Sequence, residues 1–158
     1  MTTVVQAIES SGLGRMMRES LWGYPIVETL HIIGLATVYG SILVFDLRLL
    51  GLSRGVSVSR LARHTLPWTL GAFILVLCTG LMMFTAHTAD FVGNDIFLLK
   101  MGLILTAGIN AGLLHRGAMR AAGSWDTGMP PPRVRWAAAL SILLWTSVIA
   151  CGRFLAYT

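Results

Sequence analysis

The sequence predicts an all-α integral membrane protein whose four transmembrane helices form an up-down-up-down bundle. Hydrophobic residues make up 55% of the 158 residues, charged residues only 12%, and the mean hydropathy is +0.73. Soluble domains carry about 25% charged residues, so a chain of this composition needs lipid to cover its apolar surface. The sequence also holds four apolar runs of about 20 residues, the length that crosses the hydrocarbon core.

A short N-terminal helical segment is expected to precede the bundle. Residues 1–20 mix apolar and polar positions, and Gly12 and Gly14 interrupt the pattern. Short amphipathic helices of this kind lie in the membrane interface with their apolar face toward the lipid. We therefore predict an interfacial segment over residues 1–20 and the four-helix domain over residues 21–158.

Local signals indicate where each span begins. Pro25, preceded by the interfacial Trp22, can open a helix without losing a hydrogen bond, and the second span is expected to start near Pro67. Asn94 is a good N-cap for the third span. Three consecutive prolines from Pro130 are expected to keep the loop before the fourth span non-helical. The predicted spans cover residues 25–45, 67–86, 95–115 and 136–155.

The arginines indicate the orientation of the chain in the membrane. The loops that follow the first and third spans are rich in arginine, whereas the loop between the second and third spans has no Lys or Arg. The positive-inside rule places both arginine-rich loops in the cytoplasm, although Arg15 and Arg18 oppose this placement. We therefore expect a bacterial inner-membrane protein with both termini in the periplasm. Since the net charge of +5 lies in these loops, it does not predict a nucleic-acid partner.

Glycines in the first and third spans predict close approach between helices, because small residues let backbones pack tightly in lipid. The sequence leaves open whether these contacts form within one chain or between chains of a homo-oligomer. The glycines are Gly34, Gly40, Gly102, Gly108 and Gly112.

Ionisable residues inside the spans predict the position of a functional site, because such residues are costly in lipid. Glu28 and His31 are three residues apart and so neighbours on one helix surface. The alternating topology brings polar groups of the other three spans to the same outer level. The predicted outer cluster comprises Glu28, His31, Met82, Met83, His87, Lys100 and Arg153.

In one interpretation, this outer cluster binds a redox cofactor or metal. Imidazole and thioether groups are ligands of haem iron. His31, together with His87 or a methionine, could therefore hold a haem b whose propionates are neutralised by Lys100 and Arg153. Copper is the alternative, because imidazole and thioether groups also bind copper. The copper site would comprise His31, Met82, Met83 and Met101.

In the other interpretation, the chain is a non-catalytic membrane subunit or a permease for small solutes or metals. Glu28 would then form a structural or gating pair with Lys100, while Arg153 would extend its charge to the headgroups. The sequence has no serine-hydrolase, zinc-protease or nucleotide-binding motif. Any activity is therefore expected to be that of an electron carrier, working with another redox or membrane protein subunit.

A second polar layer is predicted near the cytoplasmic side. Asp46 and Arg48 lie close to the end of the first span, and His64 and His115 flank the second and third spans at matching depth. Near the interface such groups are usually solvated or structural. A metal-ligand pair made by His64 and His115 is the alternative.

Three segments resemble a known family. They are WGYPIVETLHIIGLATVYGSILVFDLRLLGL, LPW and IFLLKMGLILTAGINAGLLH. They resemble a widespread family of small uncharacterised bacterial membrane proteins, and ETLHIIG and FDLRLLG are the most specific stretches. The resemblance covers nearly all of the chain after residue 20 and implies a four-span inner-membrane fold without an agreed activity. In outline the chain is also similar to the membrane part of copper-resistance D proteins, which likewise place a histidine in an early span.

Overall fold

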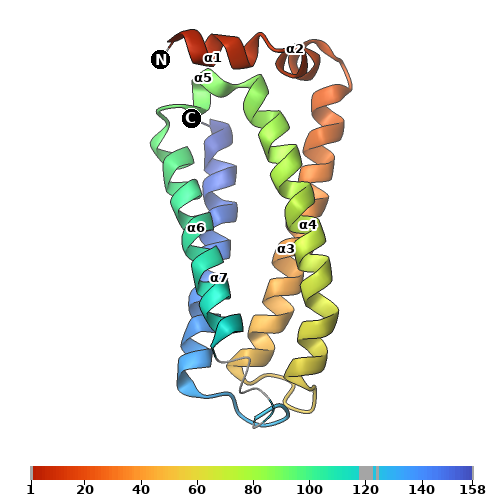
Figure 1. The fold of residues 1–158 in the computed structure, drawn as a ribbon, viewed down its shortest axis with the longest axis vertical. Coiled ribbons are helices and arrows are strands. Elements are labelled where there is room, and N and C mark those ends of the chain that lie inside the picture. The colour runs from red at the N-terminus through yellow and green to blue at the C-terminus, as the bar shows by residue number, and fades with distance from the viewer. Residues whose placement is uncertain (1, 118–122, 124, 158) are drawn as a thin grey trace.

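A computed structural model describes residues 2–117, 123 and 125–157, and these are helical wherever they form regular secondary structure. Four of the helices are long and apolar enough to cross a membrane. They run alternately up and down, so the two chain termini lie at one end, the terminal end, and the two long loops at the other, the loop end (Figure 1). The four are α3 (Gly23–Leu50), α4 (Val58–Ala86), α6 (Asp95–Arg116) and α7 (Pro132–Phe154).

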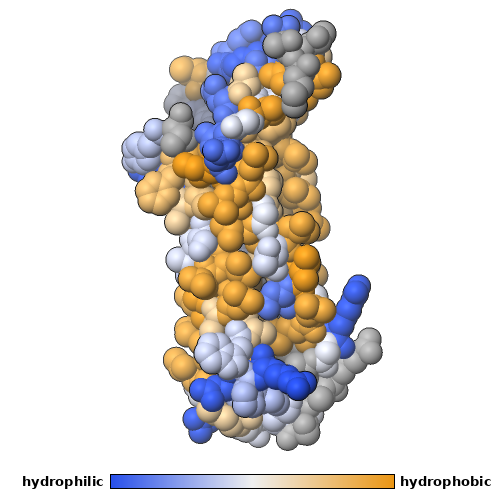
Figure 2. Space-filling model, turned by 90° about the vertical axis from the view of Figure 1, so that its left-hand side faces the viewer, coloured by the Kyte–Doolittle hydropathy of each residue, from blue (hydrophilic) through white to orange (hydrophobic). Residues whose placement is uncertain are grey.

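The helices pack as two hairpins. α3 packs closely against α4 and α6 against α7, and the contact between α3 and α7 joins the two hairpins. α4 and α6 are not among the closely packed pairs. Figure 2 shows a wide hydrophobic band between hydrophilic ends, and large apolar side chains such as Leu98, Leu105 and Leu113 of α6 are exposed there. This surface is suited to lipid.

Short helices close the terminal end. α1 (Thr2–Glu9) and α2 (Gly12–Glu19) lie across it (Figure 1), while α5 (Thr88–Phe91) connects α4 to α6 and a 3-10 turn, Leu155–Tyr157, follows α7. Met17 of α2 is buried against Val27 and Ala86. Arg18 donates hydrogen bonds to the carbonyl oxygens of Ala86, at 3.1 Å, and Glu9, at 2.6 Å. The N-terminal segment is therefore docked on the bundle by specific contacts.

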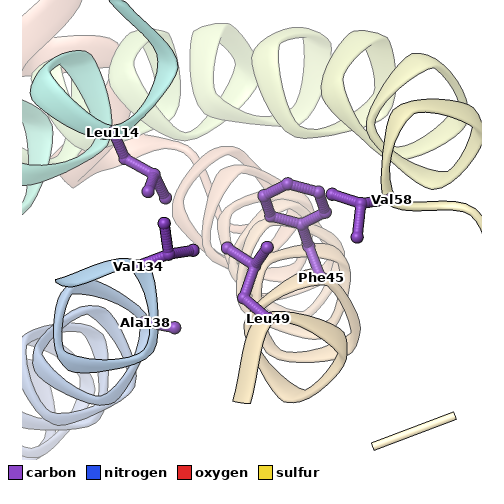
Figure 3. Close-up of a cluster of buried hydrophobic side chains, with 6 residues drawn as sticks. All are labelled: Phe45, Leu49, Val58, Leu114, Val134 and Ala138. Atoms are coloured by element: carbon purple, nitrogen blue, oxygen red, sulfur yellow. The ribbon is translucent and has the colours of Figure 1, made fainter. Parts of the chain in front are cut away.

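The interior of the bundle has three apolar clusters along its axis. At the loop end, all four long helices contribute to one cluster (Figure 3). A second cluster, which we call the mid-bundle layer, is extended by Phe73, whose ring lies 6.4 Å from that of Trp145. The third lies beneath α2. The loop-end cluster comprises Phe45, Leu49, Val58, Leu114, Val134 and Ala138, and the mid-bundle layer has Val38, Ala107, Leu144, Trp145 and Val148 at its centre.

Some helix boundaries differ from those predicted. Asn94 caps α6 as expected, because its side-chain oxygen accepts two backbone N–H groups of the first turn. α4, however, begins at Val58, so Pro67 lies inside the helix. A proline in a helix costs one hydrogen bond, which close packing on α3 offsets here. The last of the three consecutive prolines, Pro132, is the first residue of α7, where a proline's missing N–H costs nothing.

Five glycines were predicted to allow close approach between helices. Gly34 is the one of these at which two helices of the chain come together. A Cβ atom at Gly34 would lie 2.7 Å from Cγ2 of Val76 on α4. At the other four glycines, a Cβ would meet no other described atom within 4 Å. The close contact between α3 and α4 therefore depends on Gly34.

We expect Gly34→Ala to lower the free energy of unfolding by about 1–3 kcal/mol, because the stiff Val76 side chain leaves no room for a methyl group. The matched variant Gly40→Ala has open space and should be neutral or stabilising by about 0.5–1 kcal/mol, since alanine is the better helix former. Thermal unfolding in detergent, followed by circular dichroism, compares the two. Equal stabilities of the two variants would contradict this prediction, because they would show that α3 and α4 can move apart at Gly34 without a loss of stability.

Candidate functional site

His31 lies inside the terminal half of the bundle, where α4 fixes its ring. Nδ1 of His31 is 2.8 Å from Oγ1 of Thr79, a buried residue of α4. The same Thr79 hydroxyl donates to the carbonyl oxygen of Leu75 at 2.7 Å. Because a hydroxyl has only one proton, it must accept a hydrogen bond from His31. We therefore assign the Nδ1–H tautomer to the neutral imidazole, which leaves the lone pair of Nε2 available.

Lys100 approaches His31 from α6. It interacts electrostatically with the His31 imidazole, and its side chain reaches α7, where a Cβ atom at Gly152 would lie 3.4 Å from Nζ. A Cβ at Gly80 of α4 would lie 3.2 Å from Cε1 of His31, so glycines make room for both polar side chains. We call His31, Thr79, Gly80, Lys100 and Gly152 the His31 site; all four long helices contribute to it.

Lys100 does not pair with Glu28, contrary to the sequence-based prediction. Among the described residues, no carboxylate oxygen lies within 4.0 Å of Nζ of Lys100. Glu28 is exposed on α3 and interacts electrostatically with Tyr24. The three-residue spacing from His31 therefore leaves Glu28 turned away from the interior.

His87 lies at a different depth from His31. It follows the last residue of α4, stacks edge-on against Tyr24 with ring centroids 5.7 Å apart, and lies 3.4 Å from the Asp90 carboxylate. Tyr24 precedes His31 by seven residues on α3, about 10 Å along the helix axis. Two axial ligands must sit on opposite faces of one iron, so this arrangement does not favour a haem held by both histidines.

The methionines of the two predicted sites and Arg153 make other contacts. Met82 and Met83 pack on the cluster beneath α2, and Met101 is exposed on α6. Arg153 is also exposed; it donates to the Tyr157 hydroxyl at 2.5 Å and covers its ring at 4.9 Å. In the part of the chain that the structure describes, no three His, Cys, Asp or Glu side chains are grouped as a metal site.

At the loop end, the two histidines have different surroundings. His64 is exposed on α4. The ring of His115 stacks on Phe45 at 6.0 Å, and its Nδ1 lies 3.0 Å from the carbonyl oxygen of Ala111. These contacts are those of a structural residue, and they do not require a bound metal.

The comparisons with known proteins place the chain in a family. Residues 9–158 match a family of unknown function. The chain belongs to DUF6644. No curated protein and no solved structure matches it. The prediction of an uncharacterised family is thereby confirmed, and because the DUF6644 description assigns no activity, the geometry must supply the functional hypothesis.

Arg48 of this DUF6644 chain has a role that the sequence did not reveal. Its side chain is only 2% exposed. Nε donates to the carbonyl oxygen of Val56 at 2.7 Å, and one terminal nitrogen donates to that of Asp126 at 3.0 Å. The same nitrogen also reaches the carbonyl oxygens of Arg54 and Gly128. Arg48 thus ties the loop after α3 to the loop before α7.

Asp126 completes this connection on the α7 side. Its carboxylate accepts hydrogen bonds from the Ser57 hydroxyl at 2.5 Å and from the backbone N–H of Ser59 at 2.8 Å, at the start of α4. The hydrogen bond from Ser57, followed by those from Ser59, lowers the pKa of Asp126 to about 2. These bonds favour the ionised carboxylate.

The stability of the DUF6644 fold should therefore depend on Asp126 in acid. Since its folded pKa of about 2 lies below the usual 3.8, its contribution is fully present above pH ~4 and is lost as the pH falls toward 2. Melting temperatures measured across this window should fall less steeply for Asp126→Asn than for the wild type. Ser57→Ala removes a hydrogen bond that lowers the pKa of Asp126. The loss of stability should therefore occur at higher pH in this variant. Identical profiles for the wild type and Asp126→Asn would contradict this assignment.

Proposed function

We propose that the protein binds haem b in the terminal half of its bundle and carries electrons, with His31 as the iron ligand. The observation that carries this proposal is the orientation of His31, whose Nδ1–H is held by Thr79 while Nε2 remains available. Histidines that bind metals usually donate their other ring N–H to a neighbouring group, which fixes the ring and its tautomer. Haem iron would supply the one-electron chemistry.

Lys100 also supports the proposal that the protein binds haem. A lysine inside a membrane span is costly unless its charge is compensated, and no described carboxylate performs this role. A haem propionate would compensate the charge of Lys100. All four histidines of the chain are described, and none of the others shares this depth. We therefore expect His31 to be the only histidine that would hold the haem.

The proposed location is a bacterial inner membrane with the terminal end on the periplasmic side. The support is the arginine-rich loop end, which the positive-inside rule assigns to the cytoplasm. In this orientation the His31 site lies toward the periplasmic surface, where another redox or membrane subunit could exchange electrons with it. A homo-oligomer formed through the exposed glycines of α6 is a compatible arrangement.

A visible spectrum of the detergent-purified protein tests the proposal. Cells supplied with a haem precursor should yield protein with a Soret band, α and β bands after reduction, and about one haem per chain by the pyridine haemochrome method. A colourless protein under these conditions, with neither iron nor copper by elemental analysis, would contradict it. Copper in place of iron would instead support the copper alternative at His31.

Thr79 should act as a positioning residue for His31. Thr79→Val keeps the shape but removes the acceptor of the Nδ1–H, and outer-shell changes of this kind cost about 10–100-fold in metal affinity. We expect weaker haem retention and a shifted reduction potential, measured by dialysis against apomyoglobin and by redox titration. Thr79→Ser should restore both. Unchanged haem affinity and potential in Thr79→Val would remove Thr79 from the site.

The ammonium of Lys100, which no described carboxylate pairs, also favours a second candidate, a permease or non-catalytic subunit in which this cation meets an anionic solute. Metal-free and haem-free protein that is folded and monodisperse would favour this candidate. In that case, Lys100→Gln should lower solute binding or flux, whereas the exposed Arg153→Gln should not.

A further inference from the structure

Asp46 is a buried carboxyl group in the loop-end half of the bundle. Its side chain is only 2% exposed, and its Oδ2 atom has no hydrogen-bond partner among the described residues. The polar side chain that interacts with it is Ser141, a buried residue of α7. A buried carboxylate normally accepts several hydrogen bonds or pairs with a cation. Among the residues that the structure describes, Asp46 has neither arrangement.

The charged groups around Asp46 are directed elsewhere. On α3, Nε and one terminal nitrogen of Arg48 bond to carbonyl oxygens of the two loops, while Nη1 has no hydrogen-bond partner among the described residues. On α6, His115 stacks on Phe45 and contacts its own helix backbone. The charged groups near this level on α4 and α7 are exposed. They are Arg60, Arg63, His64, Arg133 and Arg135.

Apolar layers lie on both sides of this carboxyl group along the bundle. Phe45 and Leu49, one residue before and three residues after Asp46 on α3, belong to the loop-end cluster. Leu144, one turn from Ser141 on α7, belongs to the mid-bundle layer. An unpaired charge in such surroundings is costly. A proton on Oδ2 would turn the group into a neutral acid and provide an O–H donor.

We infer that Asp46 is a proton-binding site inside the membrane domain, with Ser141 as its hydrogen-bonding partner. An alkali or alkaline-earth cation fits less well, because hard cations take a full shell of oxygen ligands and the structure gives Asp46 one hydroxyl neighbour. Asp46 follows His31 by fifteen residues, about 22 Å along α3, with the mid-bundle layer between them. The inference is therefore independent of the haem proposal.

Infrared spectroscopy of the full chain in lipid vesicles tests this site. At mildly acidic pH, where exposed carboxyl groups are ionised, we expect the C=O stretching band of a protonated acid. The band should disappear in Asp46→Asn and persist in the exposed control Asp90→Asn. Ser141→Ala should keep the band but shift it to higher frequency, because one hydrogen bond is lost. The absence of any Asp46-dependent band at every pH would overturn the inference, as would its loss on adding sodium at constant pH.

A second readout applies if Asp46→Asn does not fold. Hydrophobic carbodiimides react with protonated carboxyl groups in apolar surroundings, so dicyclohexylcarbodiimide should label the Asp46 peptide of the wild type, as detected by mass spectrometry. Labelling should decrease as the pH is raised and the acid ionises. An Asp46 peptide that remains unlabelled at all pH values, while the protein stays folded, would also overturn the proposal.

Discussion

Arg48→Ala should lower the free energy of unfolding by about 3–5 kcal/mol, because each hydrogen bond made by a buried charged group is worth about 1.5–3 kcal/mol. The substitution removes the donors for carbonyl oxygens in both loops at the loop end. The Val56 carbonyl would lose its hydrogen bond from Arg48, the Asp126 carbonyl would keep only the one from the Val58 backbone N–H, and a cavity would remain between the loops. Unfolding in mixed detergent and dodecyl sulfate, followed by circular dichroism, measures the loss.

Two companion variants separate the role of Arg48 from a general effect of charge. Arg60 is exposed at the start of α4, so Arg60→Ala should change stability by no more than about 0.5 kcal/mol. Arg48→Lys keeps the charge but cannot present several N–H donors in a fixed fork, so it should be intermediate. An Arg48→Ala protein as stable as Arg60→Ala would mean that the loops hold together without this side chain.

His31→Ala should eliminate bound haem, whereas His87→Ala should leave it in place. The two residues are matched, because each is a histidine in the terminal half of the bundle. Only His31 has a ring held inside by Thr79, while His87 is exposed at the end of α4. Losing the ligand itself should exceed the about 10–100-fold effect of an outer-shell change. Absorbance at the Soret band per mole of purified protein gives the comparison.

Imidazole provides the control for folding of the His31→Ala variant. If the variant retains the bundle, added imidazole should enter the space left by the ring and restore part of the haem binding. Equal losses in His31→Ala and His87→Ala would instead indicate a haem held by both histidines, which the separation along α3 does not favour.

The sequence predicted the four spans well because hydrophobic length is a local property. Asn94 was identified correctly as the start of α6, since an N-cap acts on the next three residues. Pro67 was expected near the start of the second span, whereas the helix that contains it begins at Val58. Packing of α4 on α3, which lies outside any local pattern, lets the helix continue through this proline. The helix therefore extends beyond the predicted span where tertiary contacts override propensity.

The candidate site was only partly accessible to sequence reasoning. Topology brings Lys100 close to His31, as expected from their depths. Spacing alone could not tell that Glu28 faces outward, because three residues along a helix still rotate a side chain by about 60°. The role of Arg48 could not be predicted, since its partners are carbonyl groups of loops distant in sequence. Its position inside the apolar FDLRLLG stretch was the one signal available.

Carbon monoxide binding to the reduced, purified protein tests most directly whether His31 is the single histidine ligand of a bound haem. We predict a Soret band that shifts on adding carbon monoxide, because no other described histidine lies at the depth of His31 to compete for the iron, and we predict that His31→Ala lacks this signal. Protein that contains no haem, or a reduced haem whose spectrum carbon monoxide leaves unchanged, would contradict the proposed site.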